Sequence, residues 1–411
     1  EASAGRATPG EPGEARPFYL VAEKILEHGE SLPHDWPVAG TTGYGFLTTV
    51  NALLVDRAGL TGLTRTWTRV TGERRSFADV AYECKKVIML SSLASELNVL
   101  AHAMNVLSEG SWRTRDFTLN SCRRALLELI ACLPVYRTYV TEAGASEADR
   151  AAIAEALAAA RQRNPAMEST IFDFLESLLL PSTPEQAGVA MPPANERLAF
   201  AMKLQQYTGP VHAKGVEDTA FYRYNVLTSL NEVGGDPQRG AVTADEFHET
   251  NLRRVREWPR EMVATATHDT KRGEDHRARL NVLSEYPDEW RVALGQWMRI
   301  NAQHRTIIAG RPAPSRNDEY LFYQALVGAW PAEVEAPRHV PAGLRHRLSA
   351  FMVKAVREAK THSSWVNPND AYERAVGVFV DGVLASHTTP RFLSALAPLL
   401  QPVAAAGVLN S

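Results

Sequence analysis

Two short apolar runs, each ending on an acidic residue, constrain the fold of this sequence more than any other feature. Residues 18–22 lead directly into Glu23, and residues 262–267 lead into His268 and Asp269. Short uninterrupted apolar runs are typical of strands buried on both faces of a parallel sheet. Since parallel barrels carry their chemistry at the carboxyl ends of their strands, both acidic residues occupy positions where a reactive site is expected.

Helical periodicity dominates the rest of the chain. Apolar residues recur at helical spacing, and Ser76 and Ser146 each precede an Asp by three residues, in the manner of a capping box. A four-helix bundle needs no buried strands, so we predict an α/β fold in which a parallel barrel carries large, mostly α-helical insertions. Helices are expected over 76–110, 117–133, 146–163, 171–180, 198–207 and 221–230 and through most of 277–400, with a linker at 181–193.

Composition excludes several kinds of partner. Lys and Arg total 44 against 47 Asp and Glu, a net charge of -3, so no global positive field favours nucleic acid. The longest apolar run, 126–135, is too short to cross a bilayer. Three cysteines without C-x-x-C spacing argue against a disulfide framework or a zinc site, and a reducing cytoplasm is the expected compartment. Neither a phosphate-binding glycine loop nor metal-spaced histidines occur, so we expect no metal site.

Each acidic residue has two readings. Glu23 is either a solvated strand end or a general acid held near apolar walls. Asp269 is either the N-cap of a helix or, with His268 donating to a sugar hydroxyl, the stabiliser of positive charge at a reacting carbon. A third reading places the His-Asp dipeptide in a helical metal-dependent phosphohydrolase, which requires a helix before it.

A second polar cluster follows Lys214. Lys214 and Glu217, three residues apart, are either an ordinary helix-start pair or, with Asp218 and Tyr222, a sugar site that offers donors, acceptors and aromatic faces. The Gly-containing turn before Tyr44 is expected to present an exposed tyrosine.

These motifs together resemble the maltooligosyltrehalose synthase family of the α-amylase clan, glycoside hydrolase family 13. The resemblance runs from about residue 17 to the last residue, and its motifs are long and in the family's order. The segments that carry it are Val21-Ala-Glu-Lys-Ile-Leu26, Gly40-Thr-Thr-Gly-Tyr44, Ala213-Lys-Gly-Val-Glu-Asp-Thr-Ala-Phe-Tyr-Arg-Tyr224, Ser229-Leu-Asn-Glu-Val-Gly-Gly-Asp-Pro237 and Thr267-His-Asp-Thr-Lys-Arg-Gly-Glu-Asp275.

The resemblance implies a partial (β/α)8 TIM barrel, strands five to seven, with Glu23 as acid/base and Asp269 as transition-state stabiliser. It implies conversion of the reducing-end α-1,4 bond of a maltooligosaccharide to an α,α-1,1 bond, after which a maltooligosyltrehalose trehalohydrolase releases trehalose. No cofactor is implied. The substrate-binding residues it implies are His268, Lys214, Glu217, Asp218, Tyr44, Tyr222, Arg223, Lys271 and Arg272.

Three departures qualify this expectation. The family's nucleophilic Asp lies upstream of Glu23 and its eighth strand would follow Ser411, and Gly45 replaces a usual Asp. The chain, which begins at Glu1 and not at Met, is therefore expected to be a fragment without turnover alone. The alternatives are a hydrolytic α-amylase relative and a non-catalytic glycan-binding module. The expected parts are a lead-in at 1–16, barrel segments at 17–60 and 196–275, a helical insertion at 61–195 and a helical subdomain at 276–411.

Overall fold

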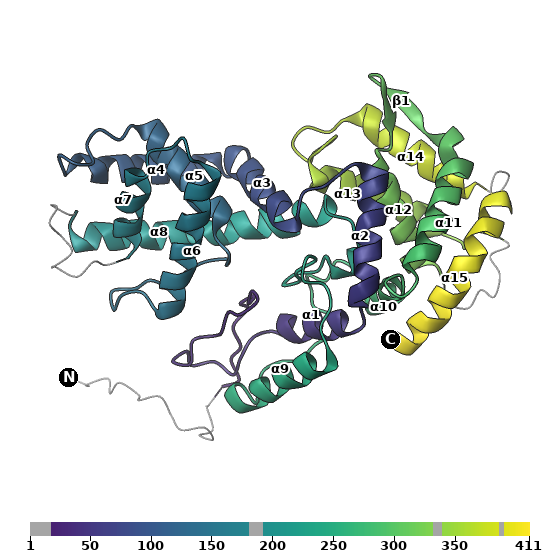
Figure 1. Ribbon diagram of the computed structural model, residues 1–411, viewed down its shortest axis with the longest axis horizontal. Coiled ribbons are helices and arrows are strands. Elements are labelled where there is room, and N and C mark those ends of the chain that lie inside the picture. The colour runs from purple at the N-terminus through teal and green to yellow at the C-terminus, as the bar shows by residue number, and fades with distance from the viewer. Residues whose placement is uncertain (1–17, 181–191, 332–338, 386–389) are drawn as a thin grey trace. The chain divides into compact units, whose positions relative to one another are not determined.

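The computed structural model describes residues 18–180, 192–331, 339–385 and 390–411 (Figure 1). The chain forms two compact units. The first unit contains Glu1–Gly72, Asn225–Met352 and Arg374–Ser411, and the second contains Glu73–Tyr224 and Val353–Glu373. Each unit is described separately below.

The second unit is a helical assembly. The capping pairs expected from sequence are confirmed: Ser76 Oγ accepts from the Asp79 amide, and Ser146 forms a full capping box with Asp149. The helix expected over 76–110 is two helices, separated at Ser91–Leu93. The helices are α3 (Phe77–Leu90), α4 (Ala94–Glu109), α5 (Leu119–Cys132), α6 (Glu147–Arg163), α7 (Thr170–Leu179) and α8 (Ala194–His212). Their apolar faces meet in one core in which α5 is buried along most of its length.

Part of the first unit packs around a cluster of aromatic side chains on α11 (Pro287–Ile300) and α12 (Arg316–Ala329). Trp290, Trp297 and Tyr320 meet edge to face and are fully buried. The helices are α1 (Tyr44–Leu53), α2 (Arg57–Thr71), α9 (Ala244–Glu257), α10 (Glu274–Val282), α11 (Pro287–Ile300), α12 (Arg316–Ala329) and α15 (Pro390–Asn410), while α13 (Leu344–Ala359) and α14 (Asp370–Leu384) each contribute residues to both units. Strands β1 (Thr306–Ile308) and β2 (Arg311–Ala313) form an antiparallel hairpin.

Helix α15 is long and apolar enough to cross a bilayer. Its side chains nevertheless pack inside the first unit, where the indole of Trp297 stacks edge to face on Phe392 and donates to the Ala395 carbonyl at 2.9 Å. Leu396 and Val403 are also fully buried. These contacts are those of a core helix.

The two predicted buried strands are absent from the described residues. Ala22 makes an isolated parallel bridge to Thr41, but Phe18 is 81% exposed and Val263 57% exposed, and 262–267 is irregular. A parallel strand requires neighbours that accept and donate its backbone hydrogen bonds, and the described residues supply only that one bridge. The described part of the chain is therefore mostly helical, with one two-stranded sheet.

The helix expected over 221–230 is also wrong. Two short 3-10 turns, Ala220–Tyr222 and Thr228–Leu230, occupy this segment. Within the first unit, the buried Gln324 amide on α12 donates to the Asn225 carbonyl at 2.7 Å and accepts from the Thr228 amide at 2.9 Å. The side chain thus takes the backbone groups that a continuous helix would use.

Candidate functional site

Four residues from three distant segments meet in the first unit. His268 Nε2 lies 3.3 Å from Glu23 Oε1 and 3.5 Å from Asp269 Oδ2. The Tyr44 hydroxyl lies 3.2 Å from each of the same two carboxylate oxygens. The carboxylates and the imidazole are exposed to solvent, whereas Tyr44 is buried. We call Glu23, Tyr44, His268 and Asp269 the carboxylate cluster.

The cluster can bind either a polar ligand or a cation. The ligand atoms of Glu23, His268 and Asp269 lie within 4.8 Å of one another, close enough to surround a metal ion. Tyr44 has one hydroxyl proton for two carboxylate acceptors, so it donates to one of them or shares its proton between them. Burial, and then the charges of Asp269 and Glu23, raise the pKa of Tyr44 well above its usual value, so the phenol remains a donor.

Tyr44 is buried, contrary to the exposed tyrosine expected from sequence. The turn before it lies directly against residues 261–264, since a Cβ on Gly43 (φ 99°) would come within 3.0 Å of the Ala264 Cβ. Thr41 donates to the Glu261 carboxylate from its amide at 3.1 Å and its hydroxyl at 2.6 Å. This close contact brings the first residue of α1 onto the segment that carries Asp269.

Asp269 is not the helix N-cap that one reading expected. It lies in a turn in which the Thr267 amide donates to Thr270 Oγ1 at 2.7 Å, and α10 begins only at Glu274, after the N-cap Gly273. The phosphohydrolase reading is not supported either, because residues 258–273 contain no helix before the dipeptide.

Lys271 and Arg272 follow this turn. Their backbone amides donate to the two carboxylate oxygens of Glu232, at 2.7 and 2.9 Å respectively. The Arg272 side chain is buried and donates to the Asn231 carbonyl at 3.3 Å. Glu232 belongs to one of the recognised motifs but was given no role from sequence, since only the fold brings it to these amides.

The remaining predicted substrate residues lie in the second unit. Lys214 and Glu217 are on a π-helical turn, Ala213–Glu217, which continues α8. Gly215 is required there because a Cβ would come within 2.9 Å of the Lys85 backbone. The exposed Lys214 ammonium lies 3.5 Å from Asp218, whereas the buried Glu217 carboxylate accepts from the Tyr136 hydroxyl.

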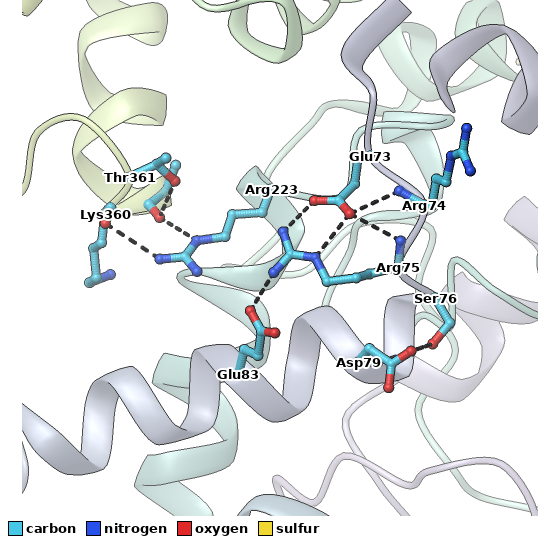
Figure 2. Close-up of polar contacts among 10 residues, drawn as sticks. Glu73, Arg74, Arg75, Ser76, Asp79, Glu83, Arg223, Lys360 and Thr361 are labelled. Atoms are coloured by element: carbon cyan, nitrogen blue, oxygen red, sulfur yellow. Dashed lines mark hydrogen bonds and ion pairs between the residues drawn. The ribbon is translucent and has the colours of Figure 1, made fainter. Parts of the chain in front are cut away.

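Arg223 and Lys360 connect the segment after this turn to the end of α13, and Figure 2 shows the Arg223 guanidinium directed at the backbone there. The Arg223 guanidinium donates to the Ala359 carbonyl at 2.6 Å, and the neighbouring Tyr222 is buried. In the opposite direction, Lys360 Nζ donates to the Asp218 carbonyl at 3.2 Å and to Thr219 Oγ1 at 2.9 Å. Lys360 was not identified from sequence, and no motif singles it out.

Proteins that are similar to this chain in sequence and in structure belong to the family that the motifs resemble. No family model matches the chain. A protein of Mycobacterium tuberculosis (strain CDC 1551 / Oshkosh) named as a maltooligosyl trehalose synthase is 35% identical over 375 residues, which is 90% of this chain and 43% of the relative. The solved maltooligosyltrehalose synthase from Arthrobacter ramosus has a TM-score of 0.75 and 33% identity, covering 95% of this chain and 44% of that one. The crystal structure of a hypothetical maltooligosyl trehalose synthase of Sulfolobus tokodaii has a TM-score of 0.69 and 29% sequence identity. This match covers 95% of this chain and 45% of that one.

By sequence and by structure, the chain is homologous to enzymes named for trehalose synthesis. More particularly, it is a homologue of part of the maltooligosyltrehalose synthases, as the motifs predicted. The chain spans less than half the length of these relatives.

Proposed function

We propose that this chain contributes the acid/base and the transition-state stabiliser of an intramolecular transglucosylation. In this reaction the reducing-end α-1,4 bond of a maltooligosaccharide becomes an α,α-1,1 bond. The observation that carries the proposal is the carboxylate cluster: Glu23 and Asp269, far apart in sequence, share one buried phenol and one imidazole. The homology provides the reaction, and the cluster provides groups suited to it.

Glu23 acts first as acid and then as base. It gives its proton to the leaving glycosidic oxygen while the anomeric carbon forms a bond to a nucleophilic carboxylate. The detached glucose turns over, and Glu23 takes the proton of its anomeric hydroxyl as that oxygen attacks the same carbon and displaces the nucleophilic carboxylate from it. Asp269 stabilises the positive charge that develops at this carbon, and His268 donates to the sugar. A nucleophilic Asp on strand four of the barrel, as the resemblance implies, completes the site.

We further propose that residues 18–22 and 262–267 are strands five and seven of a (β/α)8 barrel in the whole protein. The parallel sense of the bridge between Ala22 and Thr41 supports this proposal, because neighbouring barrel strands are parallel. Phe18 and Val263 are exposed in this chain. Strands of such a barrel are covered on both faces, so the remaining parts of the barrel would cover these two apolar side chains, which also supports the proposal.

Lys214, which is exposed, and Asp218 and Lys271, which are partly exposed, are proposed to contact sugar hydroxyls directly. The buried Glu217, Tyr222 and Arg272 and the partly exposed Arg223 are proposed to act on the sugar through the loops that they hold. The product would pass to a maltooligosyltrehalose trehalohydrolase in the cytoplasm, and no cofactor is required.

The test uses maltopentaose and a polypeptide that supplies the remaining barrel strands. The chain and this polypeptide together should convert maltopentaose to a non-reducing product of the same mass, and the chain alone should not. Glu23→Gln should abolish conversion with little change in maltopentaose affinity. Free glucose or maltose as the main product would instead indicate a hydrolytic relative. Sugar binding without conversion by any combination would indicate a glycan-binding module.

A further inference from the structure

Residues 267–273, which carry His268 and Asp269, lack a sheet to hold them. Within the turn, the Thr270 amide donates to the Thr267 carbonyl at 3.2 Å and the Asp269 amide to Thr267 Oγ1 at 3.3 Å. These bonds shape the turn locally. The backbone amides of Lys271 and Arg272, however, donate out of the turn to a single side chain.

That side chain is the carboxylate of Glu232, which is 2% exposed. Oε2 accepts from the Lys271 amide at 2.7 Å and Oε1 from the Arg272 amide at 2.9 Å, so both oxygens are used. The Arg272 guanidinium lies 4.0 Å from Oε1. Burial raises the pKa of Glu232, while the Arg272 charge and the Lys271 amide oppose that rise.

The turn that bears Glu232 is itself fixed beside the carboxylate cluster. The Gly235 amide donates to the Glu232 carbonyl at 2.8 Å. A Cβ on Gly234 would lie 3.2 Å from Ile25 and 3.7 Å from the Tyr44 Cβ. Glu232 therefore connects the Asp269 turn to the two segments that carry Glu23 and Tyr44.

We propose that Glu232 is a positioning residue that sets His268 and Asp269 relative to Glu23 by binding the amides of Lys271 and Arg272. The assignment rests on the proposed function, because it supposes that His268 and Asp269 meet a sugar. Glu232 has no part in the proton transfers, and it acts through the backbone alone.

Glu232→Gln is a sharp test because it keeps the shape of the side chain. A carboxylate offers two acceptors, whereas an amide offers one acceptor and one donor group, which would face a backbone N–H. The control is Glu319→Gln on α12, in the same unit. Glu319 is also a buried carboxylate with a raised pKa beside an arginine, Arg316, at 2.7 Å, but it does not contact the Asp269 turn.

Two measurements on the full chain decide the matter. Hydrogen exchange should show faster exchange of the Lys271 and Arg272 amides in Glu232→Gln and not in Glu319→Gln. Maltopentaose affinity should fall about tenfold in Glu232→Gln, the equivalent of one lost charge-assisted hydrogen bond. In a chain that already carries Asp269→Asn, Glu232→Gln should lower maltopentaose affinity less than about twofold. Glu232 acts by positioning the Asp269 turn, so the effects of the two substitutions are not additive.

Unchanged exchange of the two amides would overturn the assignment. So would an equal loss of affinity in both backgrounds, because a general structural defect does not depend on Asp269. A wild-type chain that binds no maltopentaose would contradict the proposed function instead, and the exchange of the two amides would then decide the positioning role alone.

Discussion

Gly43 offers the most direct test of how the carboxylate cluster is assembled. It is the N-cap of α1, with φ 99°, and Tyr44 follows it. In Gly43→Ala the new Cβ would lie 3.0 Å from the Ala264 Cβ and 3.1 Å from the Ala264 amide nitrogen. Either the turn or residues 262–264 must then move, and Tyr44 moves away from Asp269.

The magnitude follows from two contributions. A left-handed conformation costs a residue with a Cβ roughly 1–2 kcal/mol. Gly29→Ala is the matched control, because Gly29 has φ 82° and nothing within 4 Å of an added Cβ. The two variants share the backbone cost, so their difference isolates the contact with Ala264, which we expect to be roughly 1–2 kcal/mol.

Calorimetry of the first unit and maltopentaose titration provide the assay. A unit of this size loses about 2–4 °C in Tm per kcal/mol, so Gly43→Ala should melt roughly 2–8 °C below Gly29→Ala. Only Gly43→Ala should weaken maltopentaose binding. Equal melting temperatures for the two variants would refute the argument that close contact at Gly43 sets the position of Tyr44.

Further outcomes are expected at other positions. Lys360→Met should speed hydrogen exchange in residues 213–219, because it removes donors to Asp218 and Thr219; Lys354→Met, on α13 just before Lys360, is the control, and equal exchange in both would contradict this role. Burial raises the pKa of the Cys84, Cys122 and Cys132 thiols to about 11, so in the folded chain they should resist a thiolate-selective reagent at pH 8 and react on unfolding. Because the thiols lose their protons at lower pH in the unfolded chain than in the folded chain, the free energy of unfolding should be constant up to about pH 9 and should fall as the pH rises towards 11. Urea unfolding at a series of pH values measures this, and a free energy of unfolding that does not change with pH would contradict it. If the carboxylate cluster binds sugar and not a metal, EDTA should leave maltopentaose affinity unchanged, and a loss restored by a divalent ion would show the opposite.

Local signals in the sequence were sufficient for most helices of the second unit, but not for the break at Ser91–Leu93 between α3 and α4. Ser146 and Asp149 need only each other to form a capping box, and the apolar spacing of α5 is contained in one segment. Glu23 and Asp269 were singled out as candidates because the order of motifs matches a family, and their catalytic roles stay a prediction. Their meeting around His268 follows from that match and not from any local property.

Predictions failed where distant groups decide the structure. A strand at 18–22 depends on neighbours, and its sequence cannot supply them. The helix expected at 221–230 depends on whether Gln324, about a hundred residues later, takes its backbone groups. Likewise, the burial of Tyr44 depends on Glu261 and Ala264, and Glu232 is ordinary in sequence until two amides from another segment reach it.

The exposed apolar segment next to the isolated bridge between Ala22 and Thr41 affects the solubility of the chain. Phe18, Tyr19 and Leu20 extend from this bridge and are more than half exposed, and Val263 is equally exposed on another segment. Exposed apolar stretches of extended backbone readily associate with copies of themselves. Solutions of the chain should therefore cloud with increasing concentration and salt, and a charged replacement such as Leu20→Lys should keep them clear.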